Sequence, residues 1–268
     1  IVAVYLWTMM DRSVNGFTKP MGFLAFFWRL ALTTGTGSIF GFLVARTAYD
    51  SAVFAPMFII MSFAFGLAVF MLVLMLAFEW DGRPLGDVLV QRLKNLLGVF
   101  VGAVLYFWAV YFLTKLYGTQ NHEVVAFYLY NGGVYTWMFW LGQVLLGGIV
   151  PLAILFHPVL GKSRRAIAAA CGLVIVGGLA AMYVIIIGGQ AFPMPMFPGK
   201  TIVETGFYDG VGGAAAYYAP SMPEILLGLG GVGLALLVTA IAIRVLRFLP
   251  VSLADEVSDP HAATQAKA

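Results

Sequence analysis

Polar side chains within long apolar stretches of this sequence are placed where they could take part in chemistry inside a membrane. Arg29 occurs in FWRLALTTGTGSIFGF, and Gln143 occurs in MFWLGQVLLGGIVP. A charged side chain at membrane depth is costly and commonly marks an ion, proton or substrate path. We expect Arg29 either to snorkel or pair with an acidic side chain, or to belong to a proton or quinone path. Gln143 is expected to hydrogen-bond to a neighbouring helix or to a ligand.

A patch of small and hydroxylated residues, TTGTGS from Thr33 to Ser38, follows Arg29 in the same stretch. Small residues allow helices to approach closely, which favours a packing role for the patch. The alternative is a pocket wall whose hydroxyls, that of Thr33 among them, face the headgroup of a bound ligand.

Further polar and ionisable residues lie near the ends of the apolar stretches. Arg46 and Asp50 are four residues apart, an arrangement typical of an interface ion pair. His122 and Glu123 are adjacent, and they are either a surface pair or a point of proton exchange with the bulk solvent. Oxidation of a quinol needs an amphipathic cleft, hydrogen-bond partners for two oxygens and an exit for protons. The groups that could supply some of these functions are Arg46, Tyr49, Asp50, His122, Glu123 and Gln190.

Histidine and cysteine are too few for the metal cofactors of membrane redox proteins. The sequence holds three histidines, His122, His157 and His261, and one cysteine, Cys171. Haem ligation at membrane depth uses histidine pairs within helices, and an iron–sulfur cluster needs four thiolates. We therefore expect no haem, no iron–sulfur cluster and no other metal in this chain. Phosphate-binding glycine loops, HExxH and GxSxG are not found either, and nucleic-acid binding has no support.

Composition predicts an all-α integral membrane protein, a polytopic bundle of transmembrane helices. Hydrophobic residues make up 62% of the 268 residues and charged residues 10%, a proportion that a water-soluble globule could not bury. The apolar runs reach the length of about 20 residues that a helix needs to cross a bilayer, whereas barrel strands are shorter and alternate. Six full spans are predicted at residues 21–45, 52–78, 92–116, 134–156, 166–188 and 223–249.

The remaining segments are assigned from these spans and from the distribution of lysine and arginine. Residues 1–20 are expected to be the end of a truncated transmembrane helix and a cytoplasmic turn, residues 21–250 the six-helix domain, and residues 251–268 a polar cytoplasmic tail. One alternating topology places most lysines and arginines on one side, which is cytoplasmic by the positive-inside rule. The same topology predicts a long extracytoplasmic loop at residues 190–222, rich in proline and aromatic residues, that suits docking of a partner.

The phrase YYAPSMPEI before the last span has the form of a helix start. Ser221 and Glu224 match a capping box, in which each side chain bonds the backbone NH of the other, and Pro223 falls in the first turn. A helix capped at the membrane surface is therefore predicted to begin here.

Four passages carry a resemblance to a known family: RTAYDSAVFAPMFIIMSFAFGLAVF (46–70), WMFWLGQVLLGGIVPLAIL (137–155), YVIIIGGQAFP (183–193) and YYAPSMPEILLGLGG with the later RFLP (217–250). They resemble the NrfD/PsrC family, the membrane subunits of polysulfide-reductase-like complexes. The similarity covers nearly the whole chain and corresponds to the last six helices of a ten-helix member.

This resemblance implies a quinone-interacting subunit of a bacterial respiratory complex in the cytoplasmic membrane, with menaquinone or ubiquinone as an exchangeable ligand. It also implies a ferredoxin-like iron–sulfur partner on the extracytoplasmic side and a further catalytic subunit of molybdopterin, hydrogenase or multihaem cytochrome type. Some relatives carry a histidine where Thr33 stands here, so a proton path is not transferred residue by residue. Two other functions stay open, a transporter or channel subunit and a purely structural membrane anchor.

Overall fold

The computed structural model describes residues 1–192, 220–246 and 249–258. Six of its helical segments are long and apolar enough to cross a membrane: Asn15–Gly41, Phe54–Trp80, Asp87–Tyr117, Val134–Phe156, Arg164–Ala191 and Met222–Leu246. These are the six predicted spans, with ends shifted by a few residues. The described residues contain no strand, and the protein is an all-α, multi-pass membrane protein.

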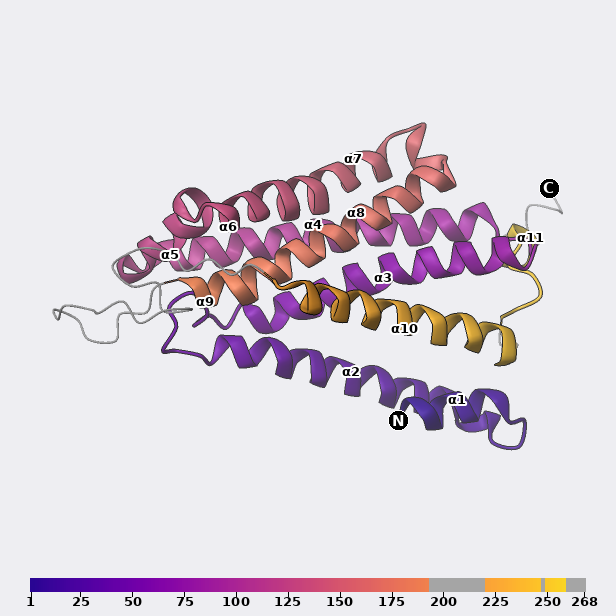
Figure 1. Cartoon of the computed structure of the whole chain (residues 1–268). Helices are drawn as coiled ribbons and strands as arrows, with labels where there is room; N and C mark the ends of the chain where they lie inside the picture. Colours follow the sequence, from indigo (N-terminus) through magenta and orange to yellow (C-terminus); the bar gives the residue numbers. More distant parts are fainter. Residues whose placement is uncertain (193–219, 247–248, 259–268) are drawn as a thin grey trace.

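The helices lie side by side along one long axis (Figure 1). The N-terminal part comprises α1 (Val2–Met10), the 3-10 turn η1 (Asn15–Phe17) and α2 (Thr18–Gly41), followed by α3 (Phe54–Trp80) and α4 (Asp87–Tyr117). Short elements η2 (Thr119–Asn121), α5 (His122–Ala126), η3 (Phe127–Asn131) and α6 (Val134–Trp137) lead to η4 (Met138–Ile149) and α7 (Val150–Phe156). The last described parts are η5 (Leu160–Lys162), α8 (Arg164–Tyr183), η6 (Val184–Gly188), α9 (Gly189–Ala191), α10 (Met222–Leu246) and α11 (Asp255–Ser258).

Helices α3, α4, α7 and α8 pack against one another, and α10 lies outside this group with none of its side chains buried. In Figure 1, α10 (gold) runs beside α3, and α2 lies with α1 at the edge of the bundle. We call the end with residues 42–53, 118–133 and 189–192 the Tyr49 end, and the end with residues 81–86 and 157–163 the Arg83 end. The C-terminal helix α11 lies at the Arg83 end, where Leu85 and Leu253 form an isolated bridge.

The buried core divides into two clusters of different composition. The cluster toward the Tyr49 end is aromatic: Trp108 and Phe112 of α4 pack against Phe139 of η4, and Tyr111 packs against Phe112. The cluster toward the Arg83 end is mostly aliphatic and includes the only cysteine, Cys171, as a buried side chain. Aromatic rings bury large areas and pack edge to face, so the aromatic cluster forms a stiff frame behind the turns of the Tyr49 end.

Helix α8 crosses the π-helical segment η4 where two glycines meet. A Cβ atom placed on Gly147 would come within 2.7 Å of the Cα of Gly177, closer than side-chain atoms approach in proteins. Glycine at both positions therefore lets the two backbones touch, as is common for helix pairs in membranes.

Two local predictions can be compared with the structure. The first span was predicted to continue beyond Gly41, but α2 ends at that residue. The last turns of α2 pack directly on the backbone of the following segment, since a Cβ on Gly37 would lie 2.6 Å from the carbonyl oxygen of Phe54. The capping prediction is confirmed for Glu224, whose carboxylate accepts from the backbone NH of Ser221 at 2.7 Å. The hydroxyl of Ser221 donates to the same carboxylate at 2.9 Å. Most of the predicted loop at residues 190–222 lies outside the described residues.

Candidate site at the Tyr49 end

The turn between α2 and α3 is held by side chains of α4. The hydroxyl of Tyr111 donates to the carbonyl of Ala48 at 2.6 Å. The ammonium group of Lys115 donates to the carbonyls of Thr47 and Asp50 at 2.7 and 2.9 Å. Backbone carbonyls in a buried turn need such partners because no helix or sheet satisfies them. The position of residues 47–50 is therefore fixed by the end of α4.

The same turn is also tied to η6 and α9, which continue from α8. The guanidinium of Arg46 donates to the carbonyl of Gln190 at 2.7 Å, and the hydroxyl of Tyr49 donates to the carbonyl of Ile186 at 2.8 Å. Gly189 makes this approach possible, because a Cβ there would lie 2.7 Å from the Cζ of Tyr49. Three of the predicted site residues, Arg46, Tyr49 and Gln190, thus come together from distant parts of the sequence, and we call them the Tyr49 cluster.

Burial keeps the phenol of this cluster neutral. Only 2% of Tyr49 is exposed, and burial raises the pKa of Tyr49 to about 12, although the charge of Arg46 and a side-chain hydrogen bond with Gln190 act in the opposite direction. Near neutral pH the Tyr49 hydroxyl is a hydrogen-bond donor. Arg46 has five N–H groups and Gln190 an amide, so the cluster holds donors beyond those used within the protein.

Asp50 belongs to the same turn, and its side chain is exposed. The described residues form the ion pairs Arg83–Asp81 and Arg164–Asp87, but Arg46 and Asp50 are not paired, so that prediction is wrong. The physical reason is that α2 ends at Gly41, which removes the helical spacing on which that pairing depended. Asp50 instead meets Lys115 through its backbone carbonyl.

His122 and Glu123 begin α5 at the same end of the bundle, and both are exposed. The Nε2 atom of His122 lies 3.0 Å from the carbonyl of Leu116, at the end of α4. Within the part of the chain that the structure describes, no hydrogen bond or ion pair joins this pair to the Tyr49 cluster.

Arg29 and Thr33 lie on α2, away from the Tyr49 cluster. Arg29 is exposed, and the hydroxyl of Thr33 donates to the carbonyl of Arg29 at 3.0 Å. Thr34 and Thr36 bond back to their own helix in the same way, at 2.8 and 3.0 Å. The three threonine hydroxyls of the TTGTGS patch are thus satisfied locally, and the structure does not bring them together with the other predicted site residues.

Gln143 is deeply buried in η4, with 2% of its surface exposed. Its Oε1 atom and the Nε1 atom of Trp108 are the two buried side-chain polar atoms without a hydrogen-bond partner among the described residues. One is an acceptor and the other a donor. The Trp108 ring packs on Phe139, which precedes Gln143 by four residues, with ring centroids 5.1 Å apart.

The sequence did not predict that Tyr111, Lys115 and Trp108 belong to this end of the protein. Lys115 is only 3% exposed, although lysine at a helix end is usually solvated. A signal was present in the spacing, because Trp108, Tyr111 and Lys115 recur at intervals of three and four residues and so share one face of α4.

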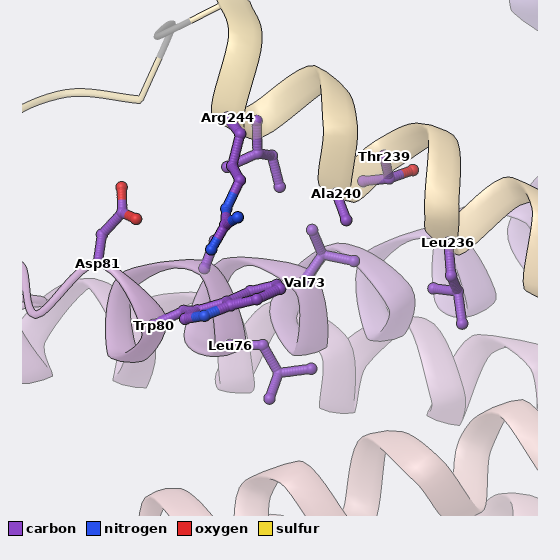
Figure 2. Close-up of a pocket in the computed structure, with 10 residues that line it drawn as sticks. Val73, Leu76, Trp80, Asp81, Leu236, Thr239, Ala240 and Arg244 are labelled. Atoms are coloured by element: carbon purple, nitrogen blue, oxygen red, sulfur yellow. The ribbon is translucent and has the colours of Figure 1, made fainter.

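Hollows lie between the membrane-crossing helices of the described bundle. A groove of about 580 Å³ runs between η4 and α8 and is lined almost wholly by apolar residues, with Trp137 and Tyr183 toward the Tyr49 end. A smaller hollow of about 200 Å³ lies between α3 and α10 at the Arg83 end (Figure 2). There the guanidinium of Arg244 lies over the Trp80 ring, 5.1 Å from its centroid.

Among the described residues no group of three or more His, Cys, Asp or Glu side chains is placed to hold a metal ion.

Comparison with known proteins places these features in context. The family model described as "Polysulphide reductase, NrfD" matches residues 1–194. The chain is 29% identical over 259 residues to an Hdr-like menaquinol oxidoreductase integral membrane subunit from Archaeoglobus fulgidus, covering 96% of this chain and 64% of the relative.

Two further relatives extend the comparison. The C subunit of the selenate reductase of Mesobacillus selenatarsenatis is 25% identical over 214 residues, covering 78% of this chain and 47% of the relative. A protein of Halobacterium salinarum named as a dimethyl sulfoxide reductase membrane subunit is 30% identical over 237 residues, covering 84% of this chain and 52% of the relative. The chain therefore spans about half to two thirds of the length of these relatives. No solved structure shows significant similarity to it.

Proposed function

This chain belongs to the NrfD polysulphide reductase family, and we propose that it is the quinone-interacting membrane subunit of a multi-subunit respiratory oxidoreductase. In this proposal it passes electrons between the membrane quinone pool and a docked iron–sulfur subunit. The names of the relatives support this function, because one is a menaquinol oxidoreductase subunit and two are reductase subunits. Menaquinone or ubiquinone is the exchangeable ligand.

The observation that carries the proposal is the Tyr49 cluster. A quinone oxygen needs a hydrogen-bond donor, and a quinol must release its protons as it is oxidised. Arg46 uses one N–H on the carbonyl of Gln190 and retains others, and the Gln190 side chain adds an amide. The neutral Tyr49 fixes the backbone beneath them through its bond to Ile186. These residues would orient a quinone headgroup at the membrane edge.

The apolar groove between η4 and α8 supplies a path for an isoprenoid tail. Tyr183 lines the groove and precedes Gln190 by seven residues, about two turns, along the same helical segment. Its aromatic and aliphatic walls match the general make-up of sites for apolar ligands. Asp50, His122 and Glu123, all exposed at this end, are the groups proposed to exchange protons with solvent.

The partners follow from the same proposal. The iron–sulfur subunit is ferredoxin-like and docks on the extracytoplasmic side, next to the Tyr49 end and the loop that begins after Gln190. A third protein, of molybdopterin, hydrogenase or multihaem type, makes up the rest of the complex. The protein lies in the bacterial cytoplasmic membrane with its C-terminus in the cytoplasm, since lysine and arginine favour that side.

Purification of the intact complex in mild detergent, with metal analysis and quinone extraction, tests this function. We expect co-purified iron and substoichiometric quinone, and labelling of residues near Gln190 by a photoreactive quinone analogue. Isolation of the chain alone, free of iron and quinone and unlabelled by the analogue, would contradict the proposal and direct attention to transport.

A further inference from the structure

A groove of about 440 Å³ lies at the Arg83 end, between the end of α3 and the start of α8. Its walls are apolar and include Leu72 and Leu76 of α3 and Ala168 of α8. Its mouth is charged and carries Glu79, Arg83, Arg164 and Arg165. Charged groups above an apolar channel at the end of a membrane-crossing helix have the polarity of a phospholipid, whose headgroup lies above its acyl chains.

Two of the three arginines are already engaged within the protein. Arg83 pairs with Asp81 at 3.1 Å and donates to the carbonyls of Leu249 and Pro250 at 2.8 and 3.0 Å. Arg164 pairs with Asp87 at 2.7 Å and also donates to the carbonyl of Leu85. These bonds fix the rim of the groove, and the paired charges largely cancel.

Arg165 and Glu79 are the charged groups that remain. Neither side chain makes a hydrogen bond or ion pair within the part of the chain that the structure describes, and both line the groove. The mouth therefore offers one guanidinium and one carboxylate to a ligand. A phosphate diester is a natural partner for the guanidinium, and a primary ammonium is a natural partner for the carboxylate.

We propose that this groove binds a phosphoethanolamine lipid, with its phosphate on Arg165 and its ammonium on Glu79. The acyl chains run along Leu72, Leu76 and Ala168 between α3 and α8. The start of α8 supports the position of the phosphate: Arg164 and Arg165 open the helix without an acidic residue in its first turn, and Ser163 makes no side-chain cap. Cations at a helix N-terminus are unfavourable, so a bound anion offsets an unfavourable arrangement. This site is separate from the Tyr49 cluster and independent of the proposed function.

Native mass spectrometry of the delipidated intact complex tests the site. The complex is supplied with equal amounts of phosphatidylethanolamine, phosphatidylglycerol and phosphatidylcholine that carry the same acyl chains. Phosphatidylethanolamine should be retained preferentially, because phosphatidylglycerol lacks the ammonium and the quaternary ammonium of phosphatidylcholine cannot donate a hydrogen bond. Excess inorganic phosphate should not displace it.

Variants assign the two contacts. Arg165→Gln should weaken retention of phosphatidylethanolamine about tenfold, as expected for loss of one charge-assisted bond. Glu79→Gln should remove the preference over phosphatidylglycerol, and Lys162→Gln, a basic residue outside the groove, is the matched control. Thermal unfolding of each variant shows that it is folded. Equal retention of all three lipids, equal behaviour of Arg165→Gln and Lys162→Gln, a preference for phosphatidylglycerol, or displacement by phosphate would each overturn the proposal.

Discussion

At the scale of single residues, the Tyr49 end is held by side chains that donate to backbone carbonyls. Tyr49, Tyr111, Arg46 and Lys115 all bond in this way, and they connect the turn after α2 to α4, η6 and α9. Each donor satisfies a backbone carbonyl that would otherwise lack a partner, and an unsatisfied carbonyl costs free energy. The bonds therefore hold the turn in one position. Its donors can then present a fixed arrangement to a ligand.

The raised pKa of Tyr49 predicts an alkaline limit to stability. Because burial raises this pKa to about 12, the unfolded chain loses the Tyr49 proton at lower pH than the folded protein. The free energy of unfolding should therefore fall as the pH rises from about 10 to 12, where the folded state binds more protons than the unfolded state. Tyr49→Phe should show a smaller fall between pH 9 and pH 11 in thermal unfolding. An equal fall in both proteins would contradict the assignment.

Lys115 should control local opening of the turn. Lys115→Met keeps the apolar stem but removes two charge-assisted hydrogen bonds to Thr47 and Asp50, so the turn should lose about 2 kcal/mol of protection. Hydrogen exchange of residues 46–50 measures this loss. Lys19→Met, at an exposed position of α2, is the control and should leave exchange at the turn unchanged. Unchanged exchange in Lys115→Met would show that the lysine does not fix the turn.

At the scale of elements, the position of Gln190 depends on how α8 crosses η4. The two backbones touch at Gly147 and Gly177, and the segment from Tyr183 to Gln190 continues from this crossing toward the Tyr49 end. The crossing thus helps to set the position of Gln190 in α9.

Two glycines of α8 should differ in how their replacement by alanine changes stability. Gly177→Ala places a methyl group into the backbone of Gly147 and should destabilise the protein by about 1–3 kcal/mol. Gly172 has open space around it, so Gly172→Ala should be neutral or stabilise the helix by up to about 1 kcal/mol. Unfolding in detergent with increasing denaturant measures both. Similar effects of the two substitutions would argue against a close crossing at Gly177.

At the scale of the whole molecule, the six spans could be predicted from the sequence, whereas the contacts between them could not. Apolar runs of about 20 residues are a property of local sequence, and the six predicted spans match the helices of the bundle. The meeting of Arg46 with Gln190 joins residues 144 positions apart, and the role of Lys115 depends on a turn 65 positions earlier. The periodicity of apolar residues along the chain does not indicate which residues so far apart in the sequence are in contact. The π-helical form of η4 and η6 was likewise not predicted, because it changes the register within a continuous apolar run.

The positive-inside distribution predicts the sidedness of the molecule. A reporter that is active only in the cytoplasm, fused after Ala268, should be active, and a reporter active only outside the cytoplasm should be inactive at the same position. Fusion of each reporter at residue 119, at the Tyr49 end, should give the opposite pattern. A reversed result at both positions would place the Tyr49 cluster on the cytoplasmic side and contradict extracytoplasmic docking of the iron–sulfur subunit.

The most direct test of the proposed quinone site is steady-state quinol turnover by the intact complex that carries Arg46→Met. Loss of the guanidinium should raise KM for quinol about tenfold, and Arg46→Lys, which keeps a charge and donors, should lie between this variant and the wild type. Arg12→Met, at an exposed arginine near the other end of the bundle, is the control. We expect this ordered rise in KM with the complex still assembled. Wild-type KM and kcat in an assembled Arg46→Met complex would contradict it and favour a purely structural anchor.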